Sequence, residues 1–475
     1  MTAIRTRPCE AEAIIHSARG PACTARQQRW VLAATILAST IAYVDESVVN
    51  VALPAIGHDL AASPASLQWV INAYTLCLAA FLLVGGAAGD RLGRRRVFIA
   101  GVALFGAASL GCGLSREIVQ LIAARAVQGA GAALLVPCSL ALIGAAFPEN
   151  ERGRAIGTWA GFSAIAAAIG PLLGGWIVDH LAWQTIFFIN PVLCLAALWI
   201  AWRHLPESTD SDAPAGIDWP GALLAFFGRA GVAFGLIALP DRGLLEPATA
   251  AALAGGIVLL AVFVWHEGRT PAPMMPLGLF RSTTFSGVNA LTLLLYGALG
   301  GALFLLPFAL ISVHGYSATM AGAVFLPFTA IMALLSRWSG GLLDRFGPRL
   351  PLVLGPVIVA AGFGLLAVAG PESSYAVAFL LPVSVLGLGM AVTVAPLTAT
   401  VIAAVPARQT GVASGINNAA SSVASLLAIA AFGALALHGS LAEGIRLAML
   451  VAAGLALAGA ACAALTMRAG GAPDR

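Results

Sequence analysis

The stretch GAAGDRLGRRR at residues 86–96 occurs a second time in altered form, as GGLLDRFGPR at residues 340–349. Both copies fit the pattern G-x-x-x-D-R-x-G-x-R, and their aspartates stand 254 residues apart, at positions 90 and 344. Each copy follows the second apolar run of a series. The two series begin near residues 31 and 283, so their starts are separated by nearly the same number of residues as the two aspartates. The stretch therefore predicts an internal repeat of a multi-helix unit.

The composition indicates a membrane protein. Hydrophobic residues make up 60% of the 475 residues and charged residues only 10%, whereas soluble proteins carry roughly 25% charged residues. The mean hydropathy is +0.92. A net charge of +4 spread over the chain does not indicate a nucleic-acid partner, and all 25 basic residues are arginine.

Fourteen runs are apolar and long enough to cross a bilayer as helices, which needs about 20 residues. The first six lie near 31–53, 67–88, 97–114, 118–147, 154–179 and 184–202, and the last six near 283–313, 317–337, 351–370, 374–396, 408–436 and 443–467. Two further runs, near 219–239 and 247–266, lie between them as an inserted pair. Parallel six-helix repeats form a transporter architecture with a site between the halves.

The arginines predict the orientation of these runs. With the N-terminus inside, the inner tails and loops hold twenty arginines and the outer loops only three, namely Arg116, Arg242 and Arg446. The first 30 residues contain five arginines and no apolar core, so they do not resemble a cleaved signal peptide. We therefore expect both termini to be cytoplasmic. The predicted units are a tail (1–30), an N-terminal six-helix bundle (31–202), a linker with the inserted pair (203–281), a C-terminal six-helix bundle (282–467) and a second tail (468–475).

Two charged residues are predicted to meet inside the membrane. Asp45 lies about eight residues from the outer end of its run and Arg125 about seven, which places both ~10–12 Å deep at 1.5 Å per residue. Charges at such depth are costly and usually face a cavity and pair. The pair could act as a proton switch, in which a proton and a cationic substrate compete for Asp45, or as a permanent lock between two helices.

Other polar residues within the runs have open roles. Glu46 follows Asp45 but points about 100° away from it, so it either faces another part of the cavity or contacts another helix. Arg229, in the first inserted run, either reaches an interface or faces a cavity. We predict that four further polar residues line the cavity: Asn50, Gln128, Asn417 and Asn418. For Asn417 and Asn418 the alternative is a hydrogen bond between helices.

Several stretches together resemble the major facilitator superfamily and, more narrowly, its fourteen-span drug:proton antiporter family of QacA-like and EmrB-like exporters. The stretches are VDESVVNVALP (44–54), GDRLGRRR (89–96), RAVQGAGAAL (125–134) and GPLLGGW (170–176), with PLGLFRSTTF (276–285) and GVASGINNAASS (411–422) later in the chain. Their order and spacing match the family over about residues 30–467. The chain departs from the family pattern at Ala166, at Glu46, and in having no acidic residue deep within the last four runs.

The resemblance implies roles for two motifs. The first loop would latch the cytoplasmic ends of the two halves through Gly86, Asp90, Arg91, Gly93 and Arg94, with Asp344 and Arg345 as a weaker echo; Asp90 is expected at or just before the start of the third run. The alternative is that these arginines only set the topology. Gly170, Pro171, Gly174 and Gly175 would form a bendable, closely packed helix at the interface of the halves, against ordinary membrane packing as the alternative.

The sequence as a whole predicts an all-α major facilitator fold with a transport function. We expect a proton-coupled antiporter in the bacterial inner membrane that exports small lipophilic compounds, with cations as one candidate class, and works as a monomer. Any accessory partner is left open. We expect no cofactor besides the proton gradient and no enzyme activity, because GxxxxGK[ST], HExxH and GxSxG are missing. The alternatives are an uptake symporter or facilitator, and a non-transporting sensor or intramembrane enzyme.

Overall fold

The computed structural model describes residues 24–209, 218–270, 273, 275–340, 342–368, 374–405, 410–436 and 440–467. The predicted tails fall outside this part of the chain, except for residues 24–30. Within it every regular element is helical. Thirteen helices are long and apolar enough to cross a membrane. The 32-residue helix α6 is not among them, and several of its side chains are not described. The multi-pass helical membrane fold is confirmed, and the count of fourteen spans stays a prediction.

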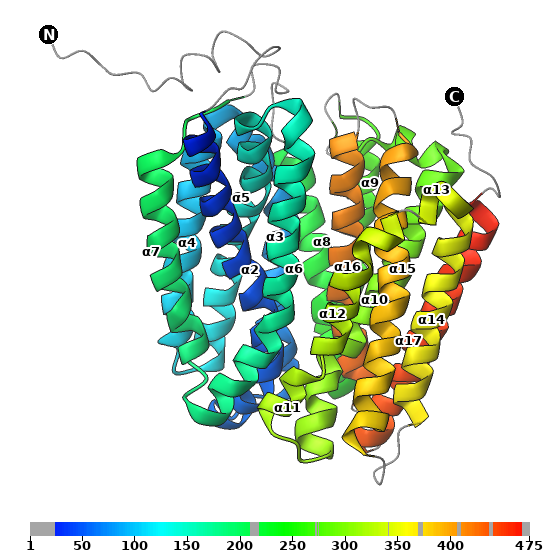
Figure 1. Cartoon of the computed structure of the whole chain (residues 1–475). Helices are drawn as coiled ribbons and strands as arrows, with labels where there is room; N and C mark the ends of the chain where they lie inside the picture. The colour runs from blue at the N-terminus through cyan, green and yellow to red at the C-terminus, as the bar shows by residue number, and fades with distance from the viewer. Residues whose placement is uncertain are drawn as a thin grey trace, which may run out of the picture.

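The N-terminal bundle contains six helices that run back and forth through the molecule (Figure 1). They are α2 (Ala25–Asp59), α3 (Pro64–Leu92), α4 (Arg94–Gly113), α5 (Ile118–Ala146), α6 (Glu149–His180) and α7 (Thr185–His204). The first helix begins six residues earlier than predicted, because Thr24 and Gln27 form a capping box. We call the end of the molecule at which α2 begins the inner end, and the opposite end the outer end.

The C-terminal bundle repeats this arrangement with local breaks. It contains α10 (Thr283–Phe308) extended by the π-helical η2 (Ala309–Val313), α11 (Ala318–Ala323), α12 (Leu326–Gly340), α13 (Leu342–Phe346), α14 (Arg349–Val368), η3 (Ala376–Leu380), α15 (Leu381–Ala403), α16 (Thr410–Ala436) and α17 (Leu441–Thr466). The predicted continuous run 317–337 is divided into α11 and α12. A short 3-10 turn, η1 (Leu277–Arg281), precedes α10.

The packing confirms the internal repeat. The pairs α2–α6, α2–α7, α3–α5, α4–α5 and α4–α7 of the first bundle correspond to α10–α16, α10–α17, α12–α15, α14–α15 and α14–α17 of the second. The repeated loop also has a glycine with a positive φ angle at the same position in both copies, Gly93 at +109° and Gly347 at +68°. Such angles favour glycine, which has no Cβ.

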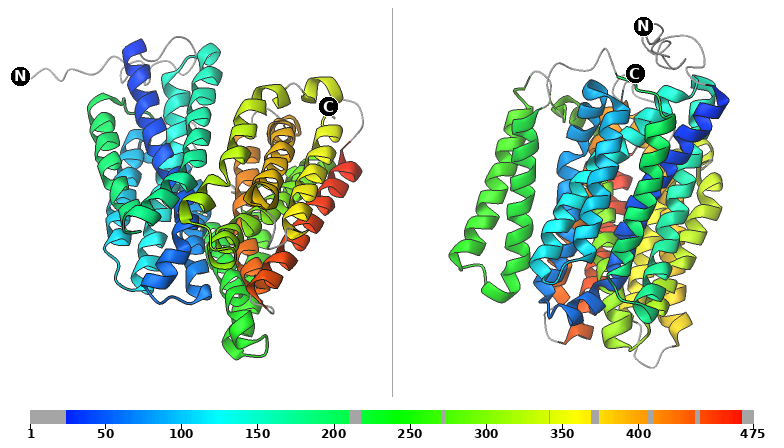
Figure 2. Two further views of the ribbon diagram at one scale, coloured as in Figure 1. Left: turned by 60° about the horizontal axis from the view of Figure 1, so that its bottom comes forward. Right: turned by 90° about the vertical axis from the view of Figure 1, so that its left-hand side faces the viewer.

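The two bundles touch each other in a reciprocal way. Helix α3 packs on α16, and α6 packs on α11 and α12, so the second and fifth helices of each half meet those of the other. The inserted pair α8 (Trp219–Arg242) and α9 (Pro247–Glu267) lies at one side of the molecule (Figure 2, right, green). Helix α8 contacts both α3 and α16 and therefore bridges the two halves.

The lipid-facing surface is apolar, as a membrane fold requires. Helix α7, for example, exposes Val192, Leu195, Trp199 and Trp202. Burial of backbone polar groups within helices lets such a surface face hydrocarbon. The fold places a set of polar side chains inside the bundles, among them Asp45, Arg125 and Gln128. These buried groups form the candidate site.

Candidate functional site

The two charges that the sequence placed at one depth form a buried ion pair. Asp45 of α2 is 1% exposed and Arg125 of α5 is fully buried. Arg125 Nη1 donates a hydrogen bond to Asp45 Oδ2. The pair lies within the N-terminal bundle, because α2 packs on α5 and α7 there.

Two amides complete the surroundings of the Asp45 carboxyl group. Gln128 Nε2 donates to Asp45 Oδ1 at 2.9 Å, and Asn190 Nδ2 of α7 donates to the same oxygen at 2.7 Å. Asn190 and Gln128 also donate to Ser109 Oγ of α4, at 2.9 and 3.3 Å. Ser109 in turn donates to the backbone oxygen of Phe187. Four helices, α2, α4, α5 and α7, are therefore joined at this point.

Arg125 extends the network to a fifth helix. Its Nε donates to the backbone oxygen of Val70 in α3 at 3.2 Å, and its Nη1 also donates to Gln128 Oε1 at 2.7 Å. The guanidinium group lies 4.3 Å from the centre of the Tyr74 ring, a cation–π geometry. Its Nη2 is buried and has no hydrogen-bond partner among the described residues.

This arrangement has a simple chemical consequence. All three neighbours of the Asp45 carboxyl group donate hydrogen bonds to it. A carboxylate has about four lone-pair positions, and these donors occupy three of them. The three hydrogen bonds are directed at the negative charge, so neutralising the group would weaken them. Because these donors come from α5 and α7, the Asp45 carboxylate helps to hold α2 against its neighbours.

Glu46 has different surroundings from its neighbour, as the helical geometry predicts. It is partly exposed, and its carboxyl group has no hydrogen bond among the described residues. Asn50, one turn further along, is also partly exposed and donates only to the backbone oxygen of Glu46, at 3.2 Å. Neither side chain shares a hydrogen bond with the Asp45 network in the described part of the chain.

The sequence did not point to Asn190, Ser109 or Tyr74, which all belong to the Asp45–Arg125 network. Asn190 had a usable signal, because it is a single amide in the apolar run IFFINPVLCLAALWIAW. Ser109 and Tyr74 had none, since a serine or a tyrosine is common in transmembrane helices. Gln128, expected to line a cavity, is instead fully buried in this network.

The span-5 glycines bring α6 close to both halves. A Cβ at Gly174 would lie 3.0 Å from the backbone oxygen of Val48 in α2, and one at Gly175 would lie 2.7 Å from Thr319 Cα in α11. On the other side, a Cβ at Gly322 of α11 would lie 2.9 Å from Leu172 N and would also meet Pro171. Gly170 faces Ser47 of α2. The motif thus packs α6 against its own bundle and against the opposite one.

One carboxylate fastens this contact at the outer end. Asp179, near the end of α6, accepts hydrogen bonds from the backbone N–H groups of Ala318 and Thr319 at 3.0 and 2.7 Å. The Thr319 hydroxyl also donates to it. These residues begin α11, so the outer ends of the two halves are tied together in this conformation.

The first-loop motif has contacts at the inner end. Asp90 lies in the last turn of α3 rather than at or just before the start of the next helix, because α3 continues to Leu92. It pairs with Arg94 at 2.8 Å. The backbone N–H of Arg95 donates to Glu207 Oε1 at 3.0 Å, which joins the loop to the chain after α7. Gly86 is half-buried in α3, and Arg91 is exposed.

The predicted site residues of the C-terminal bundle are Asp344, Arg345, Asn417 and Asn418. Arg345 is exposed in α13, and the side chain of Asp344 is outside the described part of the chain. Asn417 is engaged in a helix–helix contact, since its Nδ2 donates to Asn289 Oδ1 at 3.2 Å and to Thr292 Oγ1 at 2.7 Å. Asn418 is exposed.

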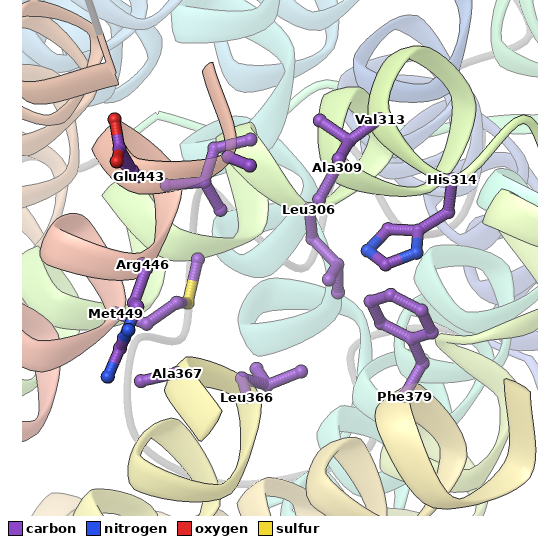
Figure 3. Close-up of a pocket in the computed structure, with 12 residues that line it drawn as sticks. Leu306, Ala309, Val313, His314, Leu366, Ala367, Phe379, Glu443, Arg446 and Met449 are labelled. Atoms are coloured by element: carbon purple, nitrogen blue, oxygen red, sulfur yellow. The ribbon is translucent and has the colours of Figure 1, made fainter. Parts of the chain in front are cut away.

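A cavity of about 280 Å³ lies at the outer end of the C-terminal bundle (Figure 3). Leu306, Leu366, Met449 and Phe379 surround it, whereas the charged ends of Glu443 and Arg446 point away from its middle. It is lined by residues of both π-helical segments. It contains none of the residues predicted from the sequence and is separate from the Asp45 network.

Comparison with known proteins places the chain in a family. Residues 35–429 match the family model of the Major Facilitator Superfamily. The chain is 36% identical to the multidrug resistance protein Stp of Mycobacterium tuberculosis over 86% of its own length and 76% of that protein. It is 35% identical to the tetracenomycin C resistance and export protein of Streptomyces glaucescens over 88% and 78% of the two chains.

Solved structures show the same fold at low identity. A bacterial homologue of the human lysosomal transporter Spinster, in an inward-facing and unoccupied conformation, superimposes with a TM-score of 0.68 at 18% identity over 93% of this chain and 97% of that one. A D-xylose–proton symporter superimposes with a TM-score of 0.68 at 14% identity over 93% and 98%. With its duplicated bundles and a family match over most of its length, the chain belongs to the Major Facilitator Superfamily.

Proposed function

We propose that this protein is a proton-coupled antiporter that exports small lipophilic compounds, including antibiotics, by alternating access. The observation that carries the proposal is the buried Asp45 carboxyl group, held by donors from three side chains on two other helices. A proton on such a group would weaken these hydrogen bonds and so favour movement of the helices that supply the donors. Coupling a proton to a conformational change requires a link of this kind.

The surroundings of the pair support this coupling. The Asp45 network fixes α2 to α5 and α7, and α2 also packs on α6, which meets the opposite half through Gly175. A proton on Asp45 would release Arg125 and loosen α2 within its bundle. The α6–α11 contact at the outer end could then open, and loss of the proton would favour the closed arrangement again.

Glu46 is the group that we assign to cargo. Its carboxyl group is partly exposed and has no described hydrogen bond, so it can attract a cationic compound at a point one residue from Asp45. A cation there would compete electrostatically with the proton for the two carboxylates. Competition of this kind produces exchange.

The relatives support the class of cargo. Besides the two named above, the chain is 34% identical to a puromycin resistance protein of Streptomyces alboniger and 32% identical to a methylenomycin A resistance protein of Bacillus subtilis. The compounds in the relatives' names differ from one relative to the next, which favours a class of substrates over a single compound. We place the protein in the cytoplasmic membrane as a monomer, driven by the ion gradient, where 100 mV supplies ~2.3 kcal/mol per charge.

The test uses full-length protein in proteoliposomes with an imposed pH gradient. Gradient-driven transport of ethidium, a fluorescent lipophilic cation, is compared in the wild type, Asp45→Asn and Glu46→Gln. The proposal expects Asp45→Asn to lose gradient-driven transport and Glu46→Gln to bind ethidium more weakly. Asp59→Asn is the matched control, because Asp59 lies at the outer end of the same helix and bonds only to Trp183 and Gln184.

Two outcomes would contradict the proposal. Full gradient-driven transport by Asp45→Asn would move the proton site elsewhere. Accumulation of ethidium with the proton flux, instead of against it, would identify an uptake symporter.

A further inference from the structure

A cavity of about 420 Å³ lies where the inserted pair meets the two halves. Its walls come from α3, α8, α9, α10 and α16, and include Ala79, Ala225, Leu260, Phe263, Ala290 and Ala420. Its size is that of a site for a small molecule. Because α8 contacts both α3 and α16, the cavity lies between elements that must move during transport.

Arg229 is the charged residue of this cavity wall. It is 6% exposed, and its Nε donates to the backbone oxygen of Ala225 at 2.8 Å. It takes part in none of the ion pairs among the described residues. An arginine in this position is costly without a partner, and its terminal nitrogens are free to bind an anion from the cavity.

The other polar groups of the wall are already used within the protein. Ser286 Oγ donates to the backbone oxygen of Phe280 at 2.6 Å, and Asn289 Nδ2 donates to that of Phe285 at 2.8 Å. The Asn289 side-chain oxygen accepts from Asn417. The cavity therefore offers apolar walls and one guanidinium group, which complements an apolar molecule with one anionic group.

The position of Arg229 also bears on the kind of anion. It stands ten residues after Trp219, the first residue of α8, which corresponds to ~15 Å along the helix and about half of the hydrocarbon thickness. A phospholipid headgroup at the bilayer surface does not reach this depth. A free amphiphile that enters the cavity does.

We propose that this cavity binds lipophilic anions, above all lipophilic carboxylic acids, with Arg229 as the residue that pairs with the anionic group. The proposal rests on the proposed export function and adds a second class of cargo to it, held at a site separate from Asp45 and Glu46. It gives a binding role to an arginine that the sequence left unexplained.

The first experiment measures binding of 11-(dansylamino)undecanoic acid and of its methyl ester to full-length protein in phosphatidylcholine nanodiscs. The two probes share the dansyl group and the alkyl chain, and the ester replaces the carboxylate with an uncharged group of similar size. We expect the acid to bind the wild type more tightly than the ester by on the order of tenfold to a hundredfold, the range of a charge-assisted hydrogen bond. Equal binding of acid and ester by the wild type would overturn the proposal without any mutation.

The variants localise the effect. Arg229→Gln should weaken binding of the acid to the level of the ester, and Arg229→Lys should restore most of it. Arg242→Gln, an exposed arginine of the same helix, is the matched control and should leave both affinities unchanged. Ala290→Phe, which fills the cavity, should weaken both probes. Unchanged binding of the acid by Arg229→Gln would overturn the proposal.

Two further measurements complete the test. The first distinguishes an anionic lipid from a free lipophilic acid as the ligand, and the second distinguishes failure of this proposal from failure of the proposed export function. Displacement of the acid by phosphatidylglycerol in the nanodisc would assign the site to anionic lipid and overturn the proposal, and persistence of acid binding would support free lipophilic acids as the ligand. Ethidium transport by the wild type is measured in parallel. Acid binding without ethidium transport would retain this site and reject the proposed export function, and the reverse would reject this site alone.

Discussion

Two adjacent carboxylates in α2 have different surroundings because successive residues of an α-helix point about 100° apart. Asp45 points into the N-terminal bundle, where Arg125, Gln128 and Asn190 donate to it. Glu46 points to a partly exposed face. One short stretch therefore places one carboxyl group inside a hydrogen-bond network and a second one outside it.

The first prediction concerns the amide that the sequence did not reveal. Asn190→Ala removes the donors to Asp45 and Ser109, and we expect it to lower the free energy of unfolding by about 1.5–3 kcal/mol, the range for hydrogen bonds to charged groups. Asn50→Ala is the matched control, since that amide bonds only to its own helix. Urea unfolding in detergent, followed by tryptophan fluorescence, measures both. Equal stability of the two variants would contradict a role of Asn190 in holding Asp45.

A second prediction concerns the turn of the repeated loop. Gly93 has a φ angle of +109°, and a Cβ there would lie 2.6 Å from Glu207 Oε1. We expect Gly93→Ala to destabilise the protein by about 1–3 kcal/mol, because the backbone is unfavourable for alanine and Glu207 must move. Gly144→Ala, in α5 with no atom within 4 Å of the added Cβ, should be neutral or slightly stabilising. Thermal unfolding compares them, and similar melting temperatures for the two variants would refute the expectation.

At the scale of the element, α6 packs against both bundles. Gly174 allows close approach of α2, and Gly175, together with Gly322 of α11 opposite Pro171, allows close approach of α11. Asp179 then accepts hydrogen bonds from the start of α11. Small residues in the helix and one carboxylate at its end thus hold the outer ends of the two halves together.

The third prediction tests this contact. Gly175→Val should force α6 away from α11, at a steric cost of typically 1–3 kcal/mol, and so expose the start of α11. In a background with Ala318→Cys, which is a buried position, labelling by a membrane-impermeant maleimide should become about tenfold faster. Gly157→Val, in the same helix with open space around it, should not change the rate. A Gly175→Val protein labelled at the control rate would show that the contact does not close the outer end.

At the scale of the molecule, the duplication makes the contacts between the halves reciprocal. The second helix of each bundle meets the fifth helix of the other, as α3–α16 and α6–α11/α12. Alternating access needs one end of these contacts to separate while the other closes. The α8–α9 pair bridges the halves at one side, so it must follow that movement.

The fourth prediction is that a covalent tie across the outer end stops transport. A protein with Asp179→Cys and Thr319→Cys, whose native side chains are hydrogen-bonded, should lose gradient-driven ethidium transport on oxidation and recover it with dithiothreitol. The control pair, Asp59→Cys with Gln184→Cys, joins α2 to α7's start within one bundle and should transport normally when oxidised. Transport by the oxidised Asp179→Cys/Thr319→Cys protein would show that the halves do not separate there.

The sequence alone determined the features that act along each helix. The length of the apolar runs predicted the membrane-spanning helices, and the repeated loop predicted the two bundles. The positions of Asp45 and Arg125 within their runs predicted that both lie at the same depth in the membrane. Lipid imposes these features locally, because a spanning segment must be apolar and must satisfy its backbone within itself. They can be read from a single chain without knowledge of its neighbours.

Only the tertiary structure decided which helix faces which. It placed Asn190, Ser109 and Tyr74 in the network around Asp45 and Arg125, and it joined Asn417 to Asn289. It also divided the tenth predicted run into α11 and α12, and it placed Arg229 in the wall of a cavity. The lateral order of helices in a membrane depends on many weak contacts between small residues and between polar side chains. Lipid does not strongly favour one lateral order of the helices over another. The sum of those contacts over both bundles, and no single stretch of sequence, sets the lateral arrangement of the site.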